Sequence, residues 1–161
     1  MKLYQKGKVG PVESARNIKI LYSDSGDVKV EVTAPLLERY EAERPYTEMT
    51  KGVKAIFYDD GMNVTSRLQA DYAIRYDREL KMEARKNVLV VNEKGDQLNT
   101  EHLIWDERTQ KLTSDEFVKI TTKDEIIYGN GFEANQDFSR YRIFNIKGII
   151  SVKTQEHATD S

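Results

Sequence analysis

Histidines are the first side chains to consider, because imidazole titrates near neutral pH and can act as a general base. The chain has two, His102 and His157. His102 falls on the polar side of an apolar-rich stretch that contains Leu103 and Trp105. His157 falls in a polar C-terminal segment. Both positions are typical of surface histidines, so we predict no catalytic base.

Paired carboxylates could support glycosidase chemistry, which needs two of them facing each other across a cleft. Here the pairs Asp59-Asp60 and Asp106-Glu107 fall at expected turn tips, where Asp accepts local backbone hydrogen bonds. The stretch Gly129-Asn130-Gly131 lacks the further glycine and the following helix of a phosphate-binding loop. Cysteine is absent, and no group has metal-ligand spacing. We therefore predict no catalytic residues, no cofactor and no metal site.

The composition limits the remaining classes. The chain has 161 residues, of which 39% are hydrophobic and 32% charged, and a formal net charge of −2. This length suits one domain with a sizeable core, and the balanced charge argues against nucleic-acid binding. No run approaches the roughly 20 apolar residues that span a bilayer. We expect a flexible leader over 1–14, one domain over 15–152 and a polar tail over 153–161.

Repeated hairpins must position whatever function the chain has. Turn glycines fall at Gly26, Gly61 and Gly95, a spacing of about 35 residues, and 122–124 supplies a fourth turn without glycine. Each repeat closes a second hairpin through a charged tip, at 41–44, 77–79, 106–110 and 137–140. The pattern predicts an all-β meander, folded as a twisted sandwich of antiparallel hairpins with open edges.

Three positions depart from simple strand alternation. Pro35 lacks a backbone donor, which predicts a strand edge or bend, and 129–131 is expected to form a bulge. The segment 80–85 has high helix propensity, but its period-2 apolar residues between two turns favour a strand.

Alternation places twelve large side chains where they could face inward. By default they form ordinary core, and the alternative is the lining of a ligand slot. They are Val30, Val32, Phe57, Leu68, Tyr72, Ile74, Val90, Leu103, Trp105, Ile120, Tyr128 and Phe132.

The first and last strands should be free edges. Unpaired edges are either blunted by charge or recruit another strand, and Lys19 and Lys147 offer partial blunting. We expect strand addition by a partner of similar architecture, or an edge-mediated homodimer. The candidate edge residues are Ile18, Ile20 and Tyr22 at one end, and Ile143, Ile146 and Ile149 at the other.

Several ordered motifs carry a family resemblance. They are the stretches 84–95, 98–101 with 103–106, 114–115 with 117–120, and 128–138, beginning with Ala84-Arg85-Lys86-Asn87-Val88-Leu89-Val90-Val91. Over about 17–152 the chain resembles the lipopolysaccharide-export family LptC, in its Bacteroidetes-type form.

The resemblance implies a twisted β-jellyroll, in which two facing sheets form a slot. The slot would shield the acyl chains of lipopolysaccharide while the sugars stay in water. Lipid would arrive from an inner-membrane ABC transporter at the N-terminal end. It would leave to an LptA-like bridge at the C-terminal end, by edge-to-edge strand pairing.

The resemblance also implies a periplasmic protein tethered to the inner membrane, without enzymatic activity. Family members carry an N-terminal membrane anchor, which is absent here, so we expect a fragment from which the anchor was removed.

Two other functions remain open. One is a carbohydrate-binding β-sandwich that uses Tyr40, Tyr58 and Trp105 as an exposed aromatic platform. The other is a structural adaptor that only pairs edges.

Overall fold

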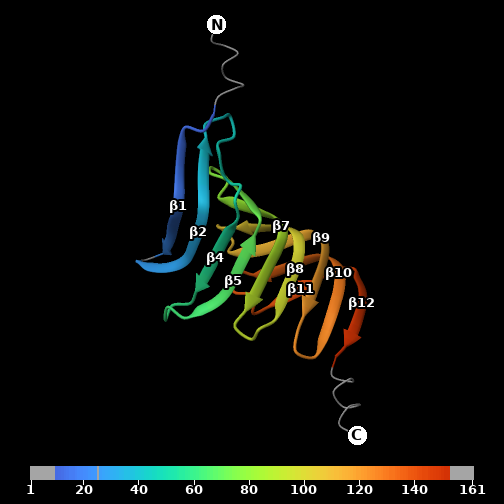
Figure 1. The fold of residues 1–161 in the computed structure, drawn as a ribbon. Coiled ribbons are helices and arrows are strands. Elements are labelled where there is room, and N and C mark those ends of the chain that lie inside the picture. The colour runs from blue at the N-terminus through green and yellow to red at the C-terminus, as the bar shows by residue number, and fades with distance from the viewer. Residues whose placement is uncertain (1–9, 25, 153–161) are drawn as a thin grey trace.

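The computed structural model describes residues 10–24 and 26–152 as one twisted antiparallel sheet of twelve strands, with no helix among them (Figure 1). Strand β1 begins inside the segment expected as a leader, whereas residues 1–9 and the expected tail 153–161 lie outside the described residues. The strands are β1 (Glu13–Asp24), β2 (Asp27–Tyr40), β3 (Tyr46–Met49), β4 (Val53–Tyr58), β5 (Val64–Ala70), β6 (Tyr72–Tyr76), β7 (Lys81–Asn92), β8 (Gln97–Asp106), β9 (Lys111–Thr121), β10 (Glu125–Asn135), β11 (Tyr141–Ile143) and β12 (Ile146–Ser151).

The chain forms this sheet as a plain meander. Three pairs of short strands continue each other across brief interruptions: β3 and β4, β5 and β6, and β11 and β12. The twelve strands therefore lie on nine passes of the chain. Each pass pairs with the passes before and after it. The predicted all-β antiparallel fold is confirmed.

Every pass bends near its middle. In β7, β8 and β10 the bend is a register shift, between Arg85 and Val88, Thr100 and Ile104, and Asn130 and Phe132. Bulges of this kind leave residues unpaired and turn the strand. The bends align across the sheet along a line that we call the seam. It passes through Asn17, Pro35, 50–52, Asp71, 86–87, 101–103, 115–116, 130–131 and 144–145.

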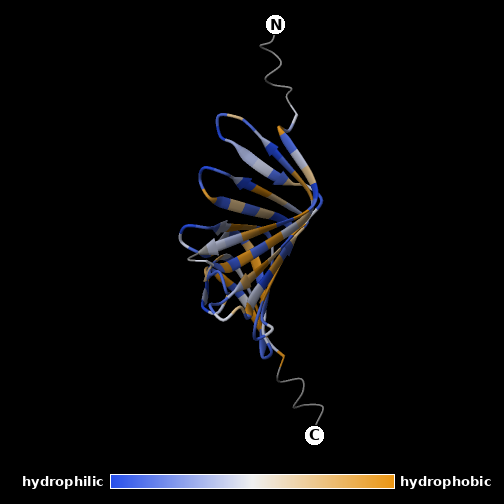
Figure 2. Ribbon diagram, turned by 90° about the vertical axis from the view of Figure 1, so that its left-hand side faces the viewer, coloured by the Kyte–Doolittle hydropathy of each residue, from blue (hydrophilic) through white to orange (hydrophobic). Residues whose placement is uncertain are grey.

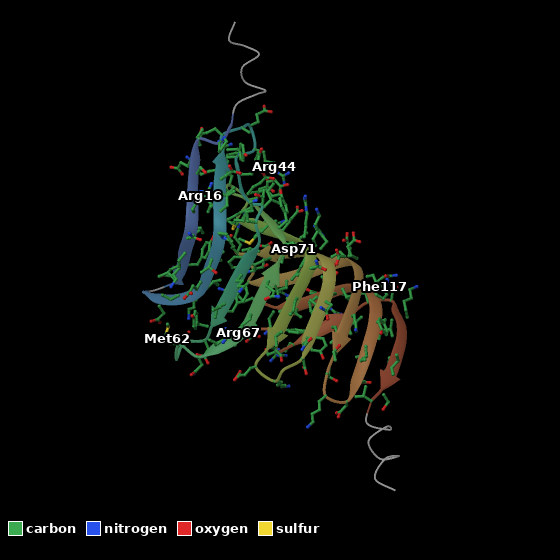
Figure 3. The ribbon with its side chains drawn as sticks, viewed as in Figure 1. Arg16, Arg44, Met62, Arg67, Asp71 and Phe117 are labelled. Carbon is green, nitrogen blue, oxygen red and sulfur yellow. The ribbon has the colours of Figure 1, made fainter. Side chains whose placement is uncertain are left out.

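The seam divides the sheet into two facing halves. We call them arm 1, which contains β4, β5 and β12, and arm 2, which contains β3, β6 and β11; the long strands contribute to both. The turns at 59–63 and 93–96 end arm 1, and the charged tips end arm 2. In Figure 2 the strands converge on one side, and their hydrophilic turns spread out on the other. Figure 3 places Met62 at the free end of arm 1 and Asp71 at the seam.

Local expectations about the bends hold. The bulge expected at 129–131 is present, and Gly131 has a φ of +106°. Pro35 lies at the bend of β2. The segment from Lys81 is a strand, and Leu80 belongs to the preceding turn, with a φ of +56°.

The core fills the space between the arms. Its members come from the inward side of both arms, and the largest fully buried side chains are Phe57, Phe132 and Phe138. Burying a large apolar side chain contributes about 1.5–3 kcal/mol. This filling of the space between the arms stabilises the bend, because a flat sheet would leave the same side chains in water. The two facing sheets that we expected are thus two halves of one folded sheet.

Candidate functional site

One row of inward side chains runs across all of arm 1. Residues directly opposite each other on paired strands share a face of the sheet. Strand register therefore connects these residues from one edge to the other: Ile20, Val32, Ala55, Leu68, Val90, Leu98, Ile120, Ile127 and Ile149. All nine are apolar, which makes a continuous apolar lining.

Exposure changes along this row. Val32, Val90 and Ile120 are each 0% exposed, whereas Ile149 at the last strand is 56% exposed. Ile146, on the same inward face, is also exposed, at 53%. The lining is therefore sealed in the middle and open at the C-terminal edge.

Nine of the twelve predicted lining residues lie in the core cluster between the arms. They are Val30, Val32, Phe57, Leu68, Val90, Leu103, Trp105, Ile120 and Phe132. Their position suits either ordinary core or a slot in its closed state, and whether they contact a ligand stays a prediction.

The other three lie on outer faces. Ile127, not Tyr128, pairs with buried Ile120, so Tyr128 points outward and stacks on Phe117 with ring centroids 5.8 Å apart. The interruption at Asp71 shifts the alternation by one residue, which turns Ala73 inward and Tyr72 and Ile74 outward. The prediction that these three side chains face inward is therefore wrong, because a bend changes which residues of a strand face the interior.

Tyr72 and Ile74 are covered on the outside of arm 2. Tyr72 donates its hydroxyl hydrogen bond to Glu48, and Ile74 lies between Glu48 and Glu83 on the neighbouring strands. Burial, together with the Glu48 carboxylate, raises the pKa of Tyr72. Tyr72 and Ile74 therefore pack among glutamate side chains on the outer face and do not line the interior.

Trp105 joins the arms inside the core. Its ring makes edge contacts with Phe57 and Tyr22, each at a centroid distance of 5.5 Å, and both partners belong to arm 1. The indole is 5% exposed, and its Nε1 donates a hydrogen bond of 2.9 Å to Gln136 Oε1. The aromatic platform that we considered for carbohydrate is therefore wrong for Trp105.

The β10–β11 loop, 136–140, closes the long side of the interior. Phe138 within it is 0% exposed and packs against Phe132 and Tyr141, with centroids 5.7 and 5.0 Å away. The sequence placed this loop among the charged tips. A lone aromatic residue in such a tip is the sequence signal that could have predicted the burial of Phe138.

Two hydrogen bonds tie this loop to the opposite arm. Ser66 Oγ donates to the Gln136 carbonyl at 2.8 Å, and Asn92 Nδ2 donates to the Phe138 carbonyl at 2.8 Å. Each donor side chain is almost fully buried. A hydrogen bond contributes about 1 kcal/mol net, so the loop holds the arms together with a few kcal/mol.

A charged cluster covers the interior near β1. Arg75 faces inward opposite Met82 and binds Glu107 through two hydrogen bonds, of 2.7 and 2.9 Å. Its guanidinium also lies 5.7 Å from the ring centre of Tyr22. Hydrogen bonding to Glu107 raises the pKa of Arg75, and burial raises that of Tyr22 to about 12. The cluster therefore places paired charge beside Tyr22 and the core.

The two edges differ in how they are protected. Among the described residues, β1 pairs only with β2, and β12 only with β10. Ile18, Ile20, Tyr22 and Ile143 are half-buried against the core, whereas Ile146 and Ile149 are exposed. The C-terminal edge is thus the more apolar and accessible of the two.

The groups considered for acid–base chemistry have structural partners. His102 Nε2 lies 3.1 Å from Glu83 Oε1; burial of Glu83 opposes its ionisation, but hydrogen bonds from Arg85 and His102 outweigh it and lower its pKa. Asp59 accepts the Gly61 and Asn63 amides at 2.9 Å, and hydrogen bonding by the Asn63 backbone lowers its pKa. These groups shape turns and surfaces.

A hollow of about 660 Å³ lies on the outside along the seam. Lys19, Lys51 and Lys54 line it above small buried residues such as Ala34. A second hollow, of about 330 Å³, lies between the arm ends and is lined by Phe57 and Asp60 of arm 1 and by Gln136 of arm 2.

An open-edged, folded β-meander with an apolar interior is the class that this fold and site define. A search with protein-family models matched residues 10–150 to the family described as "Lipopolysaccharide-assembly, LptC-related". The chain belongs to this family. The predicted resemblance is confirmed, and membership implies a role in lipopolysaccharide assembly and transport.

A search of the curated proteins found no match. Members of the LptC family are periplasmic components of a transport system. Among the described residues, no helix is long and apolar enough to cross a membrane. No group of three His, Cys, Asp or Glu side chains in that part of the chain could hold a metal ion.

Proposed function

We propose that this chain carries lipopolysaccharide by enclosing its acyl chains between the two arms. The observation that supports this most is the unbroken inward apolar row, which begins at half-buried Ile20 and ends at exposed Ile149. A lipid with several acyl chains needs a long apolar lining. The polar ends of both arms would leave its sugars in water.

Lipid would move from the β1 edge to the β12 edge. In this proposal an inner-membrane ABC transporter delivers it at β1, and an LptA-like bridge receives it by adding a strand to β12. Among the described residues, β12 has one neighbouring strand, β10, and this edge position supports strand addition. The exposed inward side chains Ile146 and Ile149 would continue the lining into the partner.

Photo-crosslinking with matched positions tests the lining. A photoreactive amino acid at Ile127 or Ile149 faces inward, and at Ile126 or Ile150 it faces outward from the same two strands. With lipopolysaccharide as the probe, we expect adducts at the inward pair only. Ile149 and Ile150 are exposed and Ile126 and Ile127 are half-buried, so none of these substitutions replaces a fully buried core residue. Equal labelling of both pairs, or no inward labelling of folded protein, would contradict the carrier proposal.

Replacing Ile149 by lysine tests the edge. A charge on an edge strand disfavours strand addition, and the exposed side chain contributes little to the fold. We expect binding to an LptA-like bridge to weaken about tenfold, with the urea midpoint unchanged. The matched control is Leu21→Lys on the β1 edge, where the side chain is 53% exposed, against 56% for Ile149. A bridge that binds both variants alike would contradict pairing through β12. Bridge binding without any lipid labelling would favour a structural adaptor.

A further inference from the structure

We propose that the β10–β11 loop, 136–140, is a latch that must detach from arm 1 before lipid can pass along the interior. This inference rests on the proposed function, since it assigns a gate to the same slot. The loop belongs to arm 2, and its two contacts with Ser66 and Asn92 bind it to arm 1. It therefore bridges the side of the interior that lies opposite the seam.

The bridge obstructs the path for a geometric reason. A lipid with its acyl chains inside and its sugars in water must protrude between the arm ends at every point of its path. The seam closes the other side with continuous backbone. Wherever the arm ends are joined, a protruding headgroup cannot pass, so the join at 136–138 has to open.

Phe138 also occupies the interior itself. Its ring is fully buried between Phe132 and Tyr141, in the space that acyl chains would need. The residue has a φ of +58°, in the left-handed region, where a non-glycine residue is uncommon. The closed loop thus inserts an aromatic side chain into the slot, and it does so with an unfavourable backbone conformation at Phe138.

The loop is built to move as a unit. Asn135 Oδ1 accepts the Arg140 amide at 2.9 Å, and Asp137 Oδ1 accepts the Ser139 amide at 2.9 Å. These bonds are internal and would survive detachment. The bonds that would break are those to Ser66 and Asn92, because only these reach arm 1. The Trp105 bond to the Gln136 side chain and the backbone bond from Gln136 to Gln110 lie within arm 2 and would also survive.

Cross-linking across the latch tests this inference in an otherwise cysteine-free chain. Ser66→Cys with Gln136→Cys places thiols on opposite arms, at residues joined by a 2.8 Å contact. A short bis-methanethiosulfonate reagent would join them, and a reductant would release them. The matched control is Lys54→Cys with Gln69→Cys, neighbours within arm 1. The probe is lipid A that bears a fluorescent acyl chain.

We expect the cross-linked latch variant to take up the probe at least about tenfold more slowly than its reduced form, and the control to be unaffected. Ser66→Ala, which removes the donor to the Gln136 carbonyl, should load the probe a few-fold faster. Equal uptake by the linked and reduced latch variants would overturn the latch and leave the carrier proposal standing. Failure of every form, native protein included, to bind the probe would overturn the carrier proposal and the latch with it.

Discussion

At the N-terminal end, the contact between Tyr22 and Arg75 places a charged side chain next to the apolar interior. Tyr22 lies between Trp105 and Arg75, so one ring contacts both the core and the charged cluster. Arg75 is neutralised by Glu107 and also contacts Asp77 at 3.1 Å. Paired in this way, an inward arginine is tolerated next to the core.

Tyr22 predicts an alkaline loss of stability. Its folded pKa of about 12 exceeds the ordinary 10, chiefly because it is buried. Its contribution is complete below pH 10, where both states are protonated, and it is lost as pH rises toward 12, because only the unfolded state then releases its proton. Between pH 9.5 and 12, we expect the free energy of unfolding of Tyr22→Phe to fall by about 2 kcal/mol less than that of the native protein, measured by urea unfolding.

Other tyrosines with raised pKa values contribute to the alkaline loss in both proteins, so only the difference reports on Tyr22. Tyr58→Phe is the control. Burial raises the pKa of Tyr58 too, but this tyrosine hydrogen-bonds Glu31 and lies away from the charged cluster. Identical pH profiles for the native protein and Tyr22→Phe would contradict a buried, neutral Tyr22.

At the scale of elements, the bend in each pass is the feature on which the fold depends. Each pass uses a different local device: an interruption at Asp71, a bulge at 86–87, and glycine at 131. The bends coincide because neighbouring passes are hydrogen-bonded and must turn together. A defect in one bend should therefore be felt as lost packing between the arms.

Gly129 gives the sharpest test of a bend. A Cβ added there would lie 2.5 Å from Ile143 Cγ2 and 2.8 Å from the Phe144 carbonyl oxygen. The oxygen is backbone and cannot move freely. We expect Gly129→Ala to lower the free energy of unfolding by about 2 kcal/mol or more, measured by urea denaturation.

Gly148→Ala is the matched control for that substitution. Gly148 lies on the adjacent strand, and a Cβ there would meet nothing within 4 Å. We expect a change of about 0.5 kcal/mol or less. Equal effects at the two glycines would contradict the close approach at the end of the seam.

At the scale of the whole molecule, the meander makes stability graded from centre to edge. Central strands β7 and β8 each have partners on both sides and bury Val88, Val90 and Leu98 completely. Strand β12 has one partner and exposes Ile146 and Ile149. A strand that must pair with another protein is expected at the weak end of such a gradient.

Amide hydrogen exchange should record this gradient. We expect amides of β12 to exchange at least about a hundredfold faster than those of β8, since opening the edge exposes fewer buried side chains. Amides of the 136–140 loop should exchange at an intermediate rate. Protection of β12 equal to that of β8 would contradict a graded sheet, unless the protein dimerises through that edge, which light scattering would reveal.

The strands, their order along the chain and the turns between them could be predicted from the sequence. Local chemistry suffices for this: glycine and aspartate in turns, and alternating apolar residues in strands such as Val30 and Val32. Nine of the twelve side chains predicted to face inward do lie in the core cluster. The family was also identified, because ordered motifs in register are specific.

Where each pass bends, and which face its side chains take after the bend, depends on the packing of the whole sheet. The interruption at Asp71 reversed Tyr72 and Ile74, and the bulge at 129–131 separated Tyr128 from Phe132, because one extra residue moves every later side chain to the other face. The structure also placed Phe138 inside and Trp105 against Tyr22. Those positions arise from contacts between passes distant in sequence, which no local pattern encodes.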